Sequence, residues 1–276
     1  MKNKKYKILV LSDLKYATST TLKNSIGLAK LINGDVDFFH VKKPIDIIKN
    51  DNQLSASREI NNEYKLIDKK IQKLVSPIAE QYNININHRY AIGNVKAEIR
   101  NYIKEYKPDI IVLGKRKVKP LKFIGDSITN YVLKEHDGVI MIAANNNAIE
   151  PNTKIALGVL NGKESSLSLD FSKQLVDNSK KPVKTFTVIK DSNSFKNTTI
   201  TNNKNEVEYV FEKDENTVKN LSNYLSKNNI NLLYIERERK ESNKVDLVTK
   251  NVKNVVNNLD VSLLFTGKQN MFYNNN

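Results

Sequence analysis

A basic loop between two glycines is the stretch of this sequence whose residue types could bind a phosphate group. It runs from Gly114 to Gly125, and five of the eight residues at positions 115–122 are Lys or Arg. An amphipathic stretch follows from Ser127. The free N–H groups at a helix N-terminus attract anions, and neighbouring cations strengthen that attraction. The loop therefore has the position and the charge of a phosphate site.

A second candidate group follows the first apolar run of the chain. Residues 7–11 read KILVL, and Ser12 and Asp13 come directly after them. A carboxylate at the end of a strand can accept hydrogen bonds from ribose hydroxyls or from an adenine amino group. Asp13 and the basic loop would form one nucleotide site if the fold brought them together.

The elements that must position these groups alternate along residues 1–143. Short apolar runs predict strands, and apolar residues at three- and four-residue steps predict helices, with Gly34 as the C-cap of the first helix. The predicted strands are residues 7–11, 36–41, 83–90, 109–113 and 139–143, and the predicted helices are residues 20–31, 56–81, 95–106 and 127–136.

Such alternation predicts an α/β fold, a doubly wound five-stranded parallel sheet with helices on both faces. In the strand order 3-2-1-4-5, ligands bind beyond the carboxyl ends of the first and fourth strands, where the strand order reverses. Asp13 emerges at one of these two strand ends and Gly114 at the other.

The pattern restarts after residues 145–153, which read as a linker. Residues 154–160 (KIALGVL) align without a gap with residues 7–13 (KILVLSD), and residues 231–235 (NLLYI) align with residues 109–113 (DIIVL). An internal duplication is the most economical account, with domains at 1–147 and 151–276. The remaining predicted elements are helices at 165–178, 217–226 and 245–257 and strands at 183–189, 207–211 and 261–265.

The first half resembles the universal stress protein family over its whole length, and the complete chain looks like a tandem two-domain member. The resemblance rests on KILVLSD, on FFHV in the second strand, on DIIVLG, and on GDSITNYVLK before VIMIA. It implies a site for ATP or another adenine nucleotide in the first domain. The residues that carry over to this site, or lie in its loop, are Ser12, Asp13, Val41, Gly114, Lys115, Arg116, Lys117, Gly125, Ser127 and Ile128.

The loop departs from the family pattern G-x2-G-x9-G-[ST]. Lys117 stands in place of the second glycine, and the third is either Gly125, with one residue inserted before Ser127, or is replaced by Asp126. Lysine does not readily give the close backbone approach that glycine allows. Asp126 could cap the following helix itself and so compete with a phosphate. Ligand binding and an empty site both remain open.

The second domain is expected to bind no nucleotide. In the ungapped alignment Leu160 takes the place of Asp13 and Glu236 takes that of Gly114. Both replacements remove what a nucleotide site needs, and Glu236 would repel phosphate.

Composition narrows the classes of protein. The chain has 276 residues, no cysteine and a formal net charge of +15. The absence of cysteine excludes disulfides and thiolate chemistry and fits a reducing cytoplasm. No apolar run approaches the roughly 18 residues of a membrane span. Because the lysines are spread along the chain with few aromatic residues beside them, nucleic-acid binding is the weaker interpretation.

The preferred function is a cytoplasmic, non-catalytic stress-response module that holds an adenine nucleotide in its first domain. No HExxH, P-loop or GxSxG motif is present, and the three histidines are interpreted as strand or helix-end residues rather than metal ligands. The alternatives are a ligand-free interaction scaffold and a slow ATPase. Family members commonly pair through their fifth strands, which here predicts either pairing of residues 139–143 with 261–265 within the chain or a homodimer.

Overall fold

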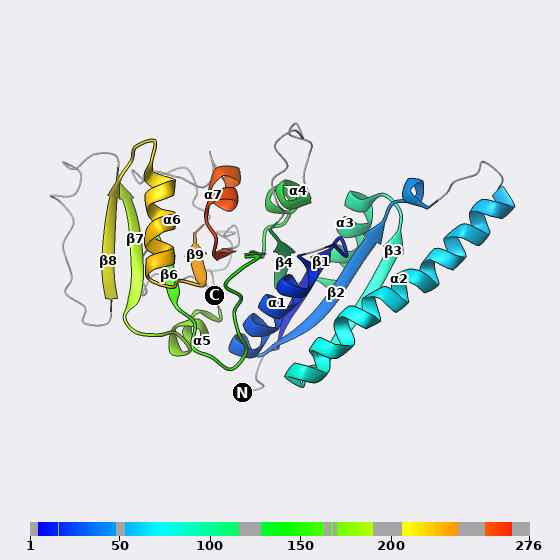
Figure 1. Cartoon of the computed structure of the whole chain (residues 1–276), viewed down its shortest axis with the longest axis horizontal. Coiled ribbons are helices and arrows are strands. Elements are labelled where there is room, and N and C mark those ends of the chain that lie inside the picture. The colour runs from blue at the N-terminus through cyan, green and yellow to red at the C-terminus, as the bar shows by residue number, and fades with distance from the viewer. Residues whose placement is uncertain are drawn as a thin grey trace, which may run out of the picture.

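The computed structural model describes residues 5–15, 17–47, 53–115, 128–162, 167, 170–189, 206–236 and 252–266. The first half of the molecule runs from β1 to β5 and the second half from β6 to β10 (Figure 1). The elements of the first half are β1 (Tyr6–Ser12), α1 (Thr18–Ile32), β2 (Gly34–Lys42), η1 (Pro44–Asp46), α2 (Gln53–Tyr82), β3 (Ile86–Ile92), α3 (Val95–Tyr106), β4 (Ile110–Gly114), α4 (Ile128–Glu135) and β5 (Val139–Ala143).

The second half repeats this alternation in a shorter form. Its elements are β6 (Leu157–Leu160), α5 (Ser172–Asp177), β7 (Val183–Ile189), β8 (Glu206–Glu212), α6 (Thr217–Lys227), β9 (Leu232–Ile235), α7 (Val252–Asn258) and β10 (Ser262–Phe265). The predicted helices at 165–178 and 245–257 are confirmed in their second parts, as α5 and α7. Most of residues 165–171 and all of residues 245–251 lie outside the described residues.

The ten described strands form one continuous sheet in the order β3-β2-β1-β4-β5-β10-β9-β6-β7-β8. The first half therefore has the predicted order 3-2-1-4-5, and the second half has the same order in mirror sequence. All pairs are parallel except β5 and β10, which pair antiparallel with Met141 opposite Leu264. The predicted pairing of the fifth strands occurs within one chain. It leaves no free edge on β5, which lies between β4 and β10.

The alternation of apolar side chains along the strands builds a core on each face of the sheet. On one face, Ile8 and Val10 of β1 pack with buried residues of α1, α2 and α5. On the other face, Leu9 and Leu11 pack with buried residues of α3, α4, α6 and α7. Both cores contain residues of both halves, so the sheet and its helices form one body.

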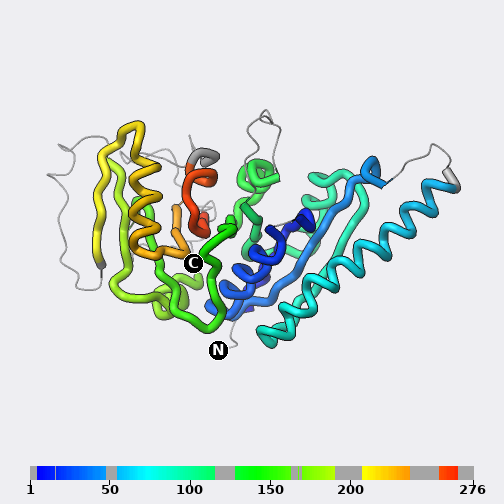
Figure 2. Tube along the Cα trace, viewed as in Figure 1, coloured from blue at the N-terminus to red at the C-terminus, as the bar shows by residue number. Residues whose placement is uncertain are grey.

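The segment from β5 to β6, predicted as a linker, is packed between the halves (Figure 2). The fully buried Asn24 of α1 accepts hydrogen bonds from the N–H of Ile149 (2.9 Å) and from Ser262 Oγ (3.0 Å). Ser262 Oγ also accepts from the N–H of Ala144 (3.1 Å). These bonds join α1, the segment and β10, because buried polar groups must find partners.

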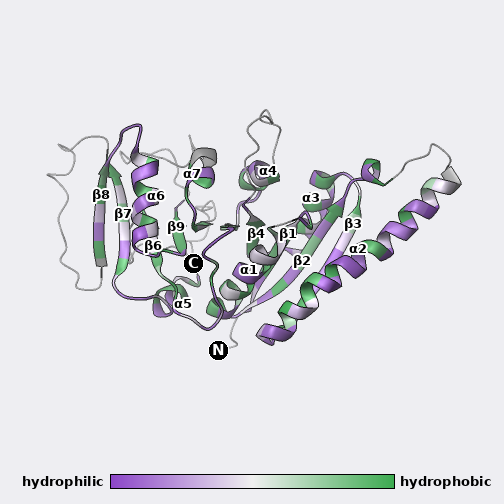
Figure 3. Cartoon of the chain, viewed as in Figure 1, coloured by the Kyte–Doolittle hydropathy of each residue, from purple (hydrophilic) through white to green (hydrophobic). Residues whose placement is uncertain are grey.

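The predicted helix at 56–81 is confirmed as α2 (Gln53–Tyr82), with Pro77 inside it. Its amphipathic pattern is visible in Figure 3, and Ile67, Ile71, Val75 and Ile78 are buried against the sheet. Only residues 190–205 separate β7 from β8, too few to supply a helix as long as the 30 residues of α2. None of the described helices has both the length and the hydropathy that crossing a membrane requires.

One predicted helix end is wrong. Gly34 was expected to cap α1, but it is the first residue of β2. Asn33 caps the helix in the left-handed conformation, with φ 58°, and donates its N–H to the carbonyl of Ala29. Asparagine tolerates this conformation better than most residues, so glycine was not required there.

Candidate functional site

The parallel pairing of β1 with β4 brings the two predicted ligand segments together. Leu11 lies opposite Leu113 in the register, so Ser12 and Asp13 leave the sheet beside Gly114. This is the place where the strand order reverses, and ligands of doubly wound sheets bind there. The juxtaposition of the two strand ends, which the nucleotide hypothesis requires, is thus present.

The turn from β1 to α1 is held by the side chains of Ser12 and Asp13. Ser12 Oγ lies 2.9 Å from Thr18 Oγ1 and accepts the N–H of Leu14 at 3.1 Å. One oxygen of Asp13 accepts the N–H of Lys15, also at 3.1 Å. Leu14 has a positive φ of 56°, which these bonds hold in place. A carboxylate has about four lone-pair sites, so Asp13 can serve this turn and a ligand hydroxyl together.

His40 of β2 fixes the end of β1 from the neighbouring strand. Its Nδ1 lies 2.8 Å from the carbonyl oxygen of Ser12, and because a carbonyl only accepts, Nδ1 carries the hydrogen. The imidazole is 5 % exposed, and this burial lowers the pKa of His40. The sequence interpretation as a strand histidine is correct, but it missed this contact at the candidate site. Val41, the next residue, is half-buried and packs against the core that contains Leu9 and Leu11.

Gly114 is required by the packing of α1. A Cβ built on Gly114 would overlap Thr21 Oγ1, far inside van der Waals contact. Thr21 Oγ1 donates to the carbonyl of Ala17 at 2.7 Å, which holds the hydroxyl in place. The sequence analysis interpreted Gly114 as a glycine that lets the backbone approach a phosphate. The structure gives a second and independent reason for a glycine at this position.

Lys115 directs its ammonium group to the second half. Its backbone N–H donates to Ala143, and its Nζ donates to the carbonyl of Leu259 at 2.8 Å, just past the end of α7. Burial lowers the pKa of Lys115, and the nearby Asp260 acts in the opposite direction. A phosphate contact from Lys115 would have to replace this bond between the halves.

The remaining predicted site residues are divided. Arg116, Lys117, Gly125 and Ser127 lie outside the described residues, so their roles stay predictions. Ile128 is the first residue of α4 and packs with its core face. Within the described ranges, no group of three or more His, Asp or Glu side chains could hold a metal ion.

The register of the second half corrects the ungapped alignment. Leu160 lies opposite Ile235, just as Leu11 lies opposite Leu113. Leu160 is therefore the counterpart of Leu11 and not of Asp13. A shift of two residues keeps every side chain on its own face of the sheet, so the apolar pattern could not reveal it.

In the corrected register, Asn161 and Gly162 take the places of Ser12 and Asp13. Asn161 has a φ of 57°, and its side-chain oxygen accepts the N–H of Val188 at 2.9 Å. Glu236 keeps its predicted equivalence with Gly114. The carboxylate of the first half therefore has no counterpart here. The expectation that this half binds no nucleotide stays a prediction on the amended residues.

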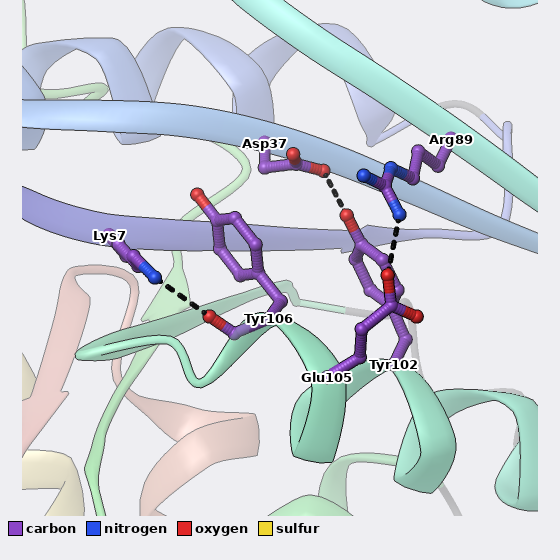
Figure 4. Close-up of polar contacts among 6 residues, drawn as sticks. All are labelled: Lys7, Asp37, Arg89, Tyr102, Glu105 and Tyr106. Carbon is purple, nitrogen blue, oxygen red and sulfur yellow. Dashed lines mark hydrogen bonds and ion pairs between the residues drawn. The ribbon is translucent and has the colours of Figure 1, made fainter.

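A second polar cluster fastens α3 to β2 toward the other end of the strands (Figure 4). Tyr102 Oη donates to Asp37 Oδ1 at 2.9 Å, and both side chains are at most 5 % exposed. Burial raises the pKa of Asp37 and of Tyr102, and it raises that of Tyr106 to about 12. Arg89 lies over the ring of Tyr102 and pairs with Glu105 at 2.9 Å. The sequence analysis missed this cluster, because its members are spread over three elements.

Comparison with known proteins agrees with the fold. The chain is similar to a universal stress protein from Archaeoglobus fulgidus DSM 4304, with 13 % identity, a TM-score of 0.63 and coverage of 95 % of this chain and 98 % of that one. It is also similar to a putative universal stress protein from Pseudomonas aeruginosa UCBPP-PA14, with 12 % identity, a TM-score of 0.57 and coverage of 96 % and 94 %. A functionally unknown protein from Pseudomonas aeruginosa PAO1 matches at 10 % identity, with a TM-score of 0.56 and the same coverage.

These identities are low, so the three structures establish the fold alone. A search of curated proteins found no match. The model of the Universal stress protein family matches residues 6–141, which span the first half from β1 into β5. Through these residues, the chain belongs to the universal stress protein family.

Proposed function

We propose that the first half binds ATP or another adenine nucleotide and that the protein is a non-catalytic, cytoplasmic stress-response module. The observation that carries this proposal is the β1–β4 pairing, which places Ser12 and Asp13 beside Gly114 at the reversal of strand order. Asp13 would accept hydrogen bonds from the ribose, and the backbone near Val41 would lie beside the base. The basic loop after Lys115 would supply the cations for the phosphates.

The direct test begins with the protein as purified. Denaturation should release an adenine nucleotide that mass spectrometry identifies, and nucleotide-free protein should show a higher Tm when ATP is added. Protein that carries no nucleotide and shows no thermal shift with ATP, ADP or AMP would contradict the proposal.

Two substitutions at Asp13 separate ligand contact from loop structure. Asp13→Ala removes both the turn bond to Lys15 and the ligand contact. Asp13→Asn keeps an oxygen that can accept the N–H of Lys15 but loses the charge. Both variants should bind ATP at least about tenfold more weakly, because charge-assisted hydrogen bonds are the strong ones. Asp46→Ala, on an exposed residue of η1, is the matched control.

A ligand-free scaffold is the second candidate, and one observation favours it. Lys115, the described cation of the loop, gives its ammonium group to Leu259, so that in this structure it joins the two halves. In a scaffold, Asp13→Asn would leave every ligand titration unchanged. A fragment of residues 1–147 would expose the edge of β5 that β10 now covers and should self-associate.

The non-catalytic part of the proposal is tested separately. Purified protein incubated with ATP and Mg²⁺ should release phosphate no faster than a Ser127→Ala variant. A rate that depends on Ser127 would replace the proposal with a slow ATPase.

A further inference from the structure

The strand β8 lies at one end of the sheet, opposite the end that α2 and β3 form (Figure 1). Among the described strands, it pairs only with β7. Lys213, just past the strand, donates its N–H to the carbonyl of Ile189 at 2.9 Å. Backbone groups alternate in direction along a strand, so odd-numbered residues of β8 face β7. The N–H and C=O groups of Glu208, Val210 and Glu212 therefore point outward.

The two edges of the sheet differ in how their side chains are covered. On β3, His88 pairs with Asp68 of α2 at 3.1 Å, and the ring of Tyr90 contacts Tyr64, 5.8 Å between centroids. The register gives Glu208 and Val210 as the counterparts of His88 and Tyr90.

On β8, Val207 is 38 % exposed and Val210 is 37 % exposed, on opposite faces of the strand. Natural edge strands are usually covered or blunted. In the first half α2 covers one face of the edge strand β3, and the second half has no helix of that length between β7 and β8.

An aromatic platform adjoins this edge. The ring of Tyr224 on α6 lies 5.4 Å from the rings of both Tyr209 and Phe211 of β8, and Phe186 stacks on Tyr209. Tyr224 is 40 % exposed. Side chains alternate between the two faces of a strand, so Val207, Tyr209 and Phe211 lie on one face of β8. An added strand would place every second one of its own side chains on that face, beside these apolar residues.

The opposite face of β8 carries charge. Glu208, Val210 and Glu212 form an acidic–apolar–acidic row in a chain whose formal net charge is +15. If a second copy paired antiparallel with β8 around Val210, Glu208 would face Glu212 of that copy, and like charges opposite each other are destabilising. A segment with Lys or Arg at both ends and an apolar residue between them would complement the row.

We propose that β8 is a docking edge for an extended, basic segment of a partner protein, which adds to the sheet as a further strand. The backbone of Glu208, Val210 and Glu212 supplies the hydrogen bonds. The two glutamates select basic residues in the partner, and the aromatic platform receives its apolar side chains. This inference is independent of the nucleotide proposal, because β8 and the β1–β4 ends belong to different halves.

The test uses the full-length protein and a synthetic peptide, Thr-Lys-Val-Ile-Phe-Lys-Thr, with a fluorescent label. Binding is followed by anisotropy at physiological salt and by hydrogen exchange of the protein amides. Bound peptide should slow exchange at Glu208, Val210 and Glu212 and leave Phe211 and Lys213 unchanged. A peptide of the same composition with alternate backbone amides N-methylated should bind at least about tenfold more weakly, because it lacks the strand hydrogen bonds.

Variants of the protein separate strand pairing from general charge attraction. Glu212→Lys should weaken binding about tenfold, whereas Glu215→Lys, the same charge change outside the strand, should alter it less than twofold. Val210→Pro, the second variant, removes one of the outward N–H groups that would donate a hydrogen bond to the peptide, and should weaken peptide binding.

Three results would each overturn the proposal. They are equal binding of the N-methylated peptide, no binding of either peptide, and concentration-dependent protection of the same amides without peptide. The last result would identify a second copy as the occupant.

Discussion

The two halves of the sheet keep one strand order and differ where strands end and where helices cover them. At the reversal of strand order, the first half has Asp13 and Gly114, and the second half has Gly162 and Glu236. The shared order depends on buried apolar side chains, which both halves retain. Strand ends contribute little to that core, so their residues can diverge without changing the fold.

One pair of counterparts shows this divergence inside a helix. Lys107, the C-cap of α3, and Asn229, the residue after the C-cap of α6, both adopt the left-handed conformation, and aligning them makes Tyr224 the counterpart of Tyr102. Tyr102 is 5 % exposed and bonded to Asp37, whereas Tyr224 is 40 % exposed. The register places Lys184 where Asp37 stands. The tyrosine at this helix position therefore joins α3 to β2 in the first half, whereas its counterpart on α6 lies at the surface.

The largest expected loss of stability is that of Tyr102→Ala, which is compared with Tyr224→Ala. Tyr102→Ala should lower the free energy of unfolding by about 3–5 kcal/mol, because it leaves a cavity and a buried Asp37 without its donor. Tyr224→Ala should cost about 1 kcal/mol, since much of its ring already contacts water. Urea unfolding monitored by circular dichroism measures both. Equal decreases in the free energy of unfolding would show that the two rings contribute equally to stability.

A smaller loss is expected for Gly114→Ala, about 1–3 kcal/mol, because the added methyl group overlaps Thr21 Oγ1. The double variant Gly114→Ala with Thr21→Ala should recover part of that loss, which a double-mutant cycle from urea unfolding quantifies. If Gly114→Ala leaves stability unchanged and only ATP binding falls, the glycine serves the ligand and not the packing of α1.

Lys115→Met keeps the apolar stem of the side chain and removes the bond to Leu259. The free energy of unfolding should fall by about 1 kcal/mol, with Lys219→Met, an exposed residue of α6, as the control. ATP titration of the same variant tells the two roles of Lys115 apart. A change in affinity below twofold fits an anchor between the halves, and a tenfold loss would mean that the ammonium moves to the phosphates.

The smallest effect is the pH dependence that Asp37 contributes. Its pKa is raised above the ordinary value of 3.8, mainly by burial, while Tyr102, Arg89 and His88 act to lower it. The folded state therefore binds this proton more tightly than the unfolded state. The stabilisation is present below the ordinary pKa and is lost as the pH rises through the folded pKa.

Asp37→Asn should remove this dependence. Between about pH 7 and about pH 4, the urea midpoint of the wild type should shift upward relative to that of Asp37→Asn as the pH falls. Asp46→Asn, on the exposed η1, should track the wild type. A relative shift in the opposite direction would mean that Tyr102, Arg89 and His88 together lower the pKa of Asp37 more than burial raises it.

Local patterns in the sequence predicted the alternating strands and helices and the long helix α2. The family resemblance predicted that the fifth strands pair, within the chain or in a homodimer, and the structure shows the antiparallel pairing of β5 with β10. Residues 139–143 were predicted as a strand and residues 95–106 as a helix, with the bounds that the structure shows. Periodicity fixes which face of an element is apolar, and alternation along the chain fixes which strands run parallel.

The family and the position of the candidate site also followed from the sequence, because KILVLSD and DIIVLG mark the two strand ends that the β1–β4 pairing joins. Only the tertiary structure decided the partners of Asp37, His40 and Lys115, and the two-residue shift that pairs Leu160 with Ile235. The physical reason is that periodicity records how apolar a face is, whereas a hydrogen bond between distant segments depends on where the register places single atoms.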